Sequence, residues 1–303
     1  MEEKKSIVLL SAYNGELYVA EQIESILQQT WKNVEIYVRD DGSSDGTGAI
    51  LKQYEAEGKI RLEMGKNVGF IKSFFWLVEH CGEADYYAYA DQDDVWFPDK
   101  LAMAMELLEK KDAARPLLYF SNYDYYDGQL NFVSHQKDTK KHPTFANALV
   151  DCMPLGFNSV FNRTASELMK QHIPQASCGH DWWTYLVCQG LGEVIYDRRP
   201  TVKYRRHEGN ASPGGMAFFK HQIWRIRKFF GQGYFANVHK MLQEYERYYK
   251  GQLSKQDQKL LRLFTQDGFH PVMALKKVFY PHKFRQTVVD ELMVRVVFLI
   301  GKL

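Results

Sequence analysis

The sequence predicts an α/β protein with a Rossmann-like, mostly parallel sheet and flanking helices, followed by a C-terminal helical extension. In the first 90 residues, short apolar runs alternate with amphipathic stretches, which is the pattern of βαβ units. A polar loop follows each apolar run, as expected where strands end at the ligand-binding edge of an open sheet. Beyond residue 215, apolar residues recur at helical spacing, which predicts the extension.

The elements are expected in a regular order. Buried strands are predicted at residues 7–10, 34–38, 60–64 and 86–90, and helices at 17–29, 47–57 and 70–80. Right-handed crossovers would bring the loops that follow the strands to one edge of the sheet. These loops read SAYNGE, DDGSSDGT, GKNVG and DQDDVW. Residues 112–215 are less regular, and the turn residues at 212–215 predict a boundary between a domain at 1–215 and an extension at 216–303.

The composition is that of a globular protein. The 303 residues are 45% hydrophobic and 25% charged, which is enough material for one large domain with an appendage. Four cysteines without a CxxC pair predict neither a zinc site nor a disulfide framework, and they favour a reducing, cytoplasmic setting. The short apolar run at 7–10 predicts a first strand rather than a signal peptide or a membrane span.

Charge is divided unequally along the chain. Residues 216–303 hold 16 Lys and Arg against 6 Asp and Glu, whereas residues 1–215 hold 23 against 31. Basic and aromatic residues alternate at 224–230, which is typical of helices that lie on an anionic membrane surface, here the inner face of the cell membrane. The alternative is that these side chains pack against the rest of the chain or a second subunit, giving a homo-oligomer. Nucleic-acid binding is disfavoured, because the first 215 residues are acidic and contain no recognised module.

The segment Asp91-Gln-Asp-Asp94 places three carboxylates directly after an apolar strand. Strand geometry would put Asp91 and Asp93 on one face, about 6.5 Å apart, with Asp94 on the other. Two carboxylates this close repel each other unless a cation compensates, and oxygen ligands suit Mn²⁺ or Mg²⁺. The alternative is a helix start that is capped by Asp93 or Asp94.

The loop RDDGSSDGT offers acceptors for the N–H of a nucleobase and the hydroxyls of a ribose. The alternative is a surface turn in which Asp45 caps the next helix. A calcium-binding loop is disfavoured because Lys52 stands where a bidentate Glu is required. The chain has no GxGxxG after the first strand and no GxxxxGK[ST], which excludes the usual dinucleotide and Walker phosphate loops.

A third acidic position, Asp181, begins an apolar helix in GHDWW. The neighbouring Trp182 and Trp183 would lower the local dielectric and raise the pKa of Asp181 towards that of a general base. Paired tryptophans also favour a sugar site, since apolar sugar faces pack on aromatic rings. The alternative is an Asp that caps the helix.

The loop YRRHEGNAS concentrates Arg205, Arg206 and His207. Arginine suits phosphate oxygens, and neutral histidine can bind a metal, so this loop is a candidate to close over a diphosphate. The alternative is a solvated basic surface.

Six segments, in their order, resemble family-2 glycosyltransferases of the GT-A fold, and more narrowly the bacterial rhamnosyltransferase-like members that build cell-surface polysaccharides. The segments span about 215 residues and read LLSAYNGELYVAEQIESILQQT, EIYVRDDGSSDGT, DQDDVWFPDKL, GFNSVFNR, GHDWW and YRRHEGNAS.

The resemblance implies a catalytic domain whose residues 1–111 bind the nucleotide and whose residues 112–215 bind the acceptor. It implies donor contacts from Ser11, Tyr13, Asp41, Asp91 and Arg206, a metal held by Asp93 and His207, a catalytic base at Asp181, and acceptor contacts from Gly156, Asn158, His180, Trp182 and Trp183. His180 stands where the family usually has Glu, so the orientation of the base is open.

The implied reaction is a metal-assisted, inverting sugar transfer. The donor would be a nucleoside diphosphate sugar such as dTDP-rhamnose or a UDP-sugar, and the acceptor a hydroxyl of a cell-wall glycan or lipid-linked glycan. Two alternatives stay open, a sugar nucleotidyltransferase and a binding module without transfer activity. The loop SAYNGE lacks the Gly-rich, Arg-containing phosphate loop that is usual in nucleotidyltransferases.

Overall fold

The computed structural model describes residues 4–139, 142–207 and 233–303, and the chain forms two compact units. Unit 1 contains the residues up to 138 together with 154–173 and 192–206, and unit 2 contains 139–153, 174–191 and the residues from 207 onward. The turn at 212–215 and the aromatic, basic segment at 224–230 lie outside the described residues.

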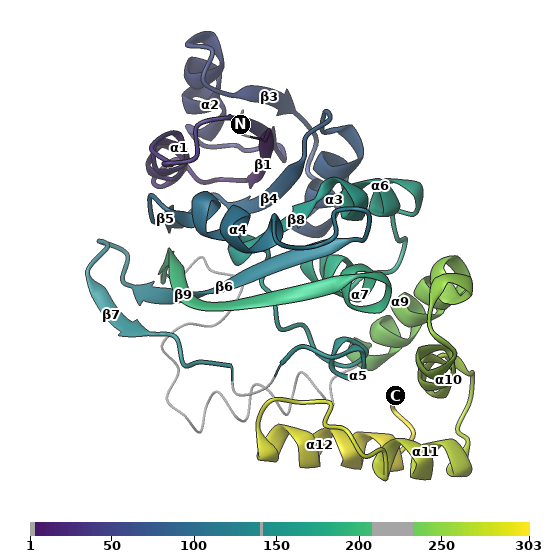
Figure 1. Cartoon of the computed structure of the whole chain (residues 1–303). Helices are drawn as coiled ribbons and strands as arrows, with labels where there is room; N and C mark the ends of the chain where they lie inside the picture. The colour runs from purple at the N-terminus through teal and green to yellow at the C-terminus, as the bar shows by residue number, and fades with distance from the viewer. Residues whose placement is uncertain (1–3, 140–141, 208–232) are drawn as a thin grey trace. The chain divides into compact units, whose positions relative to one another are not determined.

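Unit 1 is built on a nine-stranded sheet with the order β3-β2-β1-β4-β8-β6-β9-β5, in which β7 pairs with β6 (Figure 1). The strands are β1 (Ser6–Ala12), β2 (Val34–Asp40), β3 (Arg61–Met64), β4 (Tyr86–Asp91), β5 (Val95–Trp96), β6 (Leu117–Tyr126), β7 (Phe132–His135), β8 (Ser159–Asn162) and β9 (Glu193–Arg205).

Strand direction decides which ends meet at one edge. Strands β3, β2, β1 and β4 are parallel, which confirms the predicted βαβ order. Strand β8 runs antiparallel to both β4 and β6, while β9 is parallel to β6. The carboxyl ends of β1, β2, β4, β6 and β9 therefore share an edge with the beginning of β8.

The helices of unit 1 follow the strands as expected. They are α1 (Val19–Leu27), α2 (Thr47–Ala56), α3 (Phe70–His80), α4 (Lys100–Leu108) and α6 (Arg163–Gln171), with a short 3-10 helix, η1 (Gly156–Asn158). Helix α1 buries Val19, Ile23 and Ile26 at helical spacing. The side chain of Asn162 accepts a hydrogen bond from the amide of Ala165 and so caps α6.

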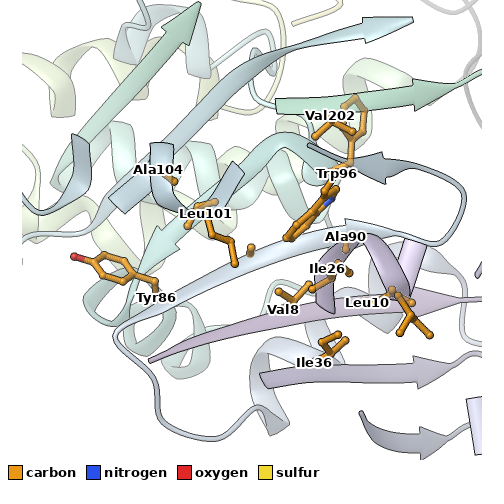
Figure 2. Packing of buried hydrophobic residues seen from close by; sticks show 14 of the residues in the cluster. Val8, Leu10, Ile26, Ile36, Tyr86, Ala90, Trp96, Leu101, Ala104 and Val202 are labelled. Atoms are coloured by element: carbon orange, nitrogen blue, oxygen red, sulfur yellow. The ribbon is translucent and has the colours of Figure 1, made fainter. Parts of the chain in front are cut away.

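The core of unit 1 explains why its strands are almost continuously apolar. Ile7, Val8, Leu9 and Leu10 of β1 are all fully buried, because a central parallel strand is covered on both faces. Figure 2 shows Val8 and Leu10 packed with Ile26 and Ile36, and Trp96 close to Val202. This packing holds the strand ends, and the loops after them, in fixed positions.

Unit 2 is helical in the part that the structure describes. Its helices are α5 (Phe145–Ala148), α7 (His180–Leu191), α9 (Tyr234–Tyr249), η2 (Lys250–Gln252), α10 (Lys255–Thr265), α11 (Pro271–Val278) and α12 (Val288–Leu299). The ring of Trp183 in α7 packs on Tyr245 and Tyr249 of α9. Helix α7, which was expected in the main domain, therefore shares a core with the C-terminal helices.

Candidate functional site

Three strand ends lie next to one another at the carboxyl edge of the sheet. Ser11 in β1 is in register with Arg39 of β2 on one side and with Asp91 of β4 on the other. The loops that follow these strands are thus neighbours, and the prediction that they share an edge is confirmed. In open α/β sheets this edge is where ligands bind.

At this edge four side chains form a largely buried polar network. The guanidinium of Arg39 pairs with the carboxylate of Asp41 and donates to the hydroxyl of Ser73 at 3.1 Å, and Ser73 shares a 2.6 Å hydrogen bond with Ser11. The carboxylate of Asp41 also accepts from the amides of Val68 at 3.0 Å and Gly69 at 2.9 Å. Ser11 and Asp41 were predicted, whereas Arg39 and Ser73 were not.

The turn after β2 is shaped by its glycine. Gly42 has a φ of 81°, and a Cβ at this position would lie 2.9 Å from the amide nitrogen of Asn67. Asp40 holds the turn by accepting from the amide of Ser43 at 3.1 Å. Helix α2 begins at Thr47, and the carboxylate of Asp45 accepts from the amide and the hydroxyl of Thr47. Asp45 therefore stabilises the start of the helix from one position earlier than an N-cap.

The loop after β4 is bound to the loop after β1 through Gln92. The Gln92 side chain accepts a hydrogen bond from the amide of Tyr13 at 2.8 Å and donates one to its carbonyl at 2.9 Å. Tyr13 itself is 45% exposed, so its ring is accessible. Gln92 was not among the predicted site residues, although it lies between two that were.

The acidic residues of DQDDVW have different surroundings. Strand β4 ends at Asp91, so the spacing derived from strand geometry does not extend to Asp93. Asp94 is fully buried and accepts a hydrogen bond from the amide of Arg205 at 3.1 Å. Burial, reinforced by the negative charges of Asp93 and Asp91, raises the pKa of Asp94 well above its usual value.

Helix capping by Asp93 or Asp94 is ruled out. Helix α4 begins at Lys100, and Asp99 occupies its N-cap position. Lys100 is fully buried and donates to the carbonyl of Phe157 at 3.1 Å. Burial lowers the pKa of Lys100 to about 7, although Asp94 opposes the shift. The interior beneath the loop therefore contains one acid and one base that are each biased towards the neutral form.

The residues around Asp91 and Asp93 fit a divalent cation that is bound together with a diphosphate. The charges of Asp91, Asp93 and Asp94 are close enough to interact. The carboxylate of Asp94 is already hydrogen-bonded to the amide of Arg205. In the part of the chain that the structure describes, no group of three or more His, Cys, Asp or Glu is placed to hold a metal. A Mg²⁺-type site needs only one or two protein carboxylates, because substrate phosphates supply other ligands.

The end of β9 reaches the same edge. Arg205 is buried and donates to the carbonyls of Asp93 at 2.8 Å and Gly128 at 3.0 Å, and it pairs with Glu21. Arg205 is thus a structural clamp on the acidic loop. The guanidinium of the next residue, Arg206, lies 3.7 Å from the ring centre of Tyr125.

Tyr204 links this strand end to the acidic loop electrostatically. Burial, together with the charges of Asp94, Asp91 and Asp93, raises the pKa of Tyr204 above its usual value. His207 is the last described residue before position 233 and belongs to unit 2, so its predicted metal role stays a prediction.

The predicted acceptor residues Gly156 and Asn158 lie in η1, just before β8. Because β8 is antiparallel to β4, its beginning lies at the ligand edge. The Asn158 side chain is buried, donating to the carbonyl of Ser121 at 2.6 Å and accepting from the amide of Leu155 at 3.0 Å. The nitrogen and the oxygen of the Asn158 side-chain amide therefore both bond to the backbone, and they link Leu155 to Ser121.

Asp181 lies in the first turn of α7, in unit 2, and is partly exposed. Its carboxylate accepts from the amide of Trp182 at 2.8 Å. A Cβ at Gly179 would collide with this carboxylate, so glycine leaves the space that the side chain of Asp181 occupies.

The neighbours of Asp181 are buried. His180 has only 4% of its surface exposed, and burial lowers its pKa to about 3, so the ring is neutral. The Trp182 ring nitrogen donates to the carbonyl of Ala148 at 2.7 Å, and Trp183 is fully enclosed by unit 2. The ring of Trp183 is engaged with Tyr245 and Tyr249 of α9, which favours a role in the core, and its contact with an acceptor sugar stays a prediction.

Sequence comparison places the chain among sugar-transferring enzymes. Residues 7–168 match the family model "Glycosyl transferase family 2". The dTDP-rhamnosyl transferase RfbG of Shigella flexneri is 30% identical over 224 residues, covering 69% of this chain and 75% of RfbG. The putative glycosyltransferase EpsE of Bacillus subtilis is 40% identical over 109 residues, covering 35% of this chain and 39% of EpsE.

Solved structures show the same GT-A fold. Staphylococcus aureus TarS 1-349 in complex with UDP-GlcNAc has a TM-score of 0.57 at 13% identity, with 89% of this chain and 83% of that chain covered. The mannosyltransferase PcManGT of Pyrobaculum calidifontis, in complex with GDP-Man and Mn²⁺, has a TM-score of 0.56 at 16% identity, with 99% and 75% covered.

Proposed function

Because the chain belongs to glycosyl transferase family 2, we propose that it moves a sugar from a nucleoside diphosphate sugar to a hydroxyl of a cell-surface glycan, with inversion at the anomeric carbon. The observation that carries the proposal is the meeting of Ser11, Arg39 and Asp91 at one sheet edge, where Arg205 at the end of β9 also bonds to the acidic loop.

The nucleoside is proposed to bind between the loops that follow β1 and β2. Tyr13 offers an accessible ring for stacking on the base. Two hydrogen bonds from the side chain of Gln92 hold the backbone of Tyr13 in place. Asp41 and Ser11 are proposed to contact the base and the ribose. Arg39 supports this role, because it orients the carboxylate of Asp41 from behind.

Asp93 and His207 are the proposed holders of Mn²⁺ or Mg²⁺, and Asp91 is proposed to contact the donor beside them. Bound there with the donor phosphates, the ion would neutralise negative charge on the diphosphate leaving group. Arg205 keeps the backbone of Asp93 in position, and Arg206 is proposed to add positive charge at the diphosphate.

We assign the role of general base to Asp181. A carboxylate at this position takes the proton of the acceptor hydroxyl while that oxygen attacks the anomeric carbon. The space beside Gly179 and the hydrogen bond from Trp182 support a fixed carboxylate orientation. Partial exposure of Asp181 leaves the carboxylate accessible to an acceptor.

The donor is proposed to be dTDP-rhamnose or a UDP-sugar, and the acceptor a glycan, free or lipid-linked. The similarity to RfbG favours the first donor. A thermal-shift panel of nucleotide sugars with and without Mn²⁺ tests the proposal, because the true donor raises the melting temperature by mass action. Transfer to a glycan with release of nucleoside diphosphate is the expected reaction. Release of pyrophosphate would instead indicate a nucleotidyltransferase, and donor binding without turnover would indicate a binding module.

A further inference from the structure

Helix α12 has an unusual distribution of side chains for a surface helix. Leu292, Val296 and Leu299 recur at helical spacing and are exposed, Leu292 by 61%. The two acidic residues, Asp290 and Glu291, are only 8% and 6% exposed. The helix therefore buries both of its acids together with Val294, Val297 and Phe298, while other apolar side chains stay exposed, which departs from the usual amphipathic pattern.

The inward acids are held by the fold. Glu291 accepts hydrogen bonds from the amides of Phe284 at 2.8 Å and Arg285 at 2.7 Å, and from the side chain of Arg295 at 2.8 Å. Asp290 accepts a hydrogen bond from the hydroxyl of Thr287 at 2.7 Å. These bonds hold the acids on the inner side of α12, and Leu292, Val296 and Leu299 are exposed.

Helix α11 presents a second apolar stripe. Val272, Leu275 and the adjoining Phe279 are exposed at helical spacing, Phe279 by 77%. Lys277 lies on the opposite side of α11, over the rings of Phe264 and Phe298. Since Phe298 belongs to α12, both helices bury one side against the same aromatic cluster and leave the stripes exposed. We call the six exposed residues of the two stripes the α11–α12 face.

The exposed charges within residues 268–303 have one sign. Between residues 268 and 303 the sequence has no acidic residues except the buried Asp290 and Glu291. The exposed charged side chains there are Lys276, Lys283 and Lys302. An apolar surface with a basic rim complements an anionic lipid bilayer, where apolar side chains enter the acyl boundary and lysines meet phosphates.

A cavity beside α11 also combines apolar and basic side chains. A cavity of about 630 Å³ between α10 and α11 has an apolar lining that includes Leu260, Leu263 and Met273. Lys259, Arg262 and Lys276 also contribute to its lining. The space therefore combines room for a hydrocarbon chain with cations suited to a phosphate.

We propose that the α11–α12 face binds the surface of an anionic phospholipid membrane, with the two helices lying in the interface. None of the helices that the structure describes combines the length and apolar composition needed to span a bilayer. A second copy of the chain is a less suitable occupant, because two basic rims would repel each other. The sequence of 208–232 carries four Lys and Arg against one Glu, so its charge does not complement a basic rim.

Vesicle flotation of the full chain, without any sugar donor, tests this proposal. We expect binding to vesicles with about 30% phosphatidylglycerol, weak binding to pure phosphatidylcholine, and release by salt. The double variant Leu292→Glu/Val296→Glu is expected to reduce the bound fraction about tenfold. The matched control is Phe132→Glu/Val133→Glu in β7 of unit 1, where the two apolar residues are 50% and 54% exposed. It should bind like the wild type.

Four results would overturn the proposal: no binding of the wild type, equal binding of the α12 variant, a dimer that the α12 variant dissociates, or a large fall in melting temperature of that variant. The last two results would mean that a second copy or this chain itself covers the face. Sugar transfer to a short water-soluble acceptor, measured on the same proteins, should be unchanged. Failure of the membrane proposal and failure of the transferase proposal are therefore separate observations.

Discussion

The side-chain amide of Gln92 is paired with the backbone of Tyr13, accepting from its N–H at 2.8 Å and donating to its carbonyl at 2.9 Å. Two loops that are 79 residues apart in the sequence are joined in this way. A Cβ at Gly15 would collide with the Gln92 side chain, so the amide lies closely against the loop. The acidic loop thus positions the proposed stacking residue.

We predict that Gln92→Leu weakens donor binding roughly tenfold, because about 1–2 kcal/mol of hydrogen bonding is lost from the loop that holds Tyr13. Isothermal calorimetry with the nucleotide measures the change. Gln53→Leu on the surface of α2 is the control, since that side chain bonds only to Glu57 among the contacts described. Equal affinity of Gln92→Leu and wild type would contradict the positioning role.

Asp93→Ala should remove the Mn²⁺-dependent gain in nucleotide affinity while leaving the metal-free affinity within about twofold. The reason is that Asp93 supplies a ligand to the metal and not to the base. Calorimetry with Mn²⁺ and with a chelator gives both values. Asp99→Ala, just before α4, should respond to Mn²⁺ as the wild type does; a full Mn²⁺ response in Asp93→Ala would refute the assignment.

Asp181→Asn is expected to lower kcat by about 10²–10⁴-fold and to leave the donor dissociation constant unchanged. The amide keeps the shape of the side chain but does not accept the proton of the acceptor. Single-turnover transfer and donor calorimetry separate the two effects. Asp267→Asn, an exposed position in unit 2, serves as the control. Turnover near the wild-type rate in Asp181→Asn would remove the base from the mechanism.

His180 should make the protein less stable in acid. Its pKa is lowered by burial to about 3 in the folded state, whereas the unfolded chain binds the proton near pH 6.5. Stability from this group is complete above pH 6.5 and is lost as pH falls towards 3, at roughly 1.4 kcal/mol per pH unit. In urea titrations, His180→Phe should show a shallower pH dependence over this range. The exposed His282→Phe should retain the wild-type slope, and identical slopes in all three proteins would contradict the argument.

Trp183 should affect stability rather than acceptor binding. Its ring is fully buried against Tyr245 and Tyr249, so Trp183→Ala should cost about 3–5 kcal/mol of unfolding free energy. Trp183→Phe should retain most of the fold and an unchanged acceptor KM. Denaturant unfolding and acceptor titrations check both statements. A KM that rises strongly in the folded Phe variant would restore the sugar-stacking interpretation.

The strand order and the shared loop edge could be predicted because each relies on local information. Apolar runs, turn residues and parallel crossovers placed Ser11, Asp41 and Asp91 at one edge, and the structure confirms this. Strand alternation was expected to turn Asp94 away from Asp91, but β4 ends at Asp91, so the burial of Asp94 comes from the loop and not from the strand.

The partners of these residues could not be predicted from local patterns. Arg39 pairs with Asp41 and donates to Ser73, which is 34 residues away, yet Arg39 has the appearance of an ordinary charged residue in the sequence. Arg205 and Arg206 are adjacent and identical in type, and only the register of β9, with its irregularities, decides which one is buried. From sequence alone, paired tryptophans are equally compatible with a buried core and with a sugar-binding site. The packing of α9 on Trp183 adds the information that the sequence lacks.

The clamp between Arg205 and the acidic loop has a consequence for anyone who exchanges loops between related enzymes. Arg205 is 111 residues from Asp94 and yet bonds to it, to the backbone of Asp93 and to Glu21 in α1. If residues 91–94 alone were replaced, the buried guanidinium of Arg205 would have to bond to a different backbone. Loop exchange in this scaffold should therefore transfer the acidic loop, Glu21 and Arg205 as one unit.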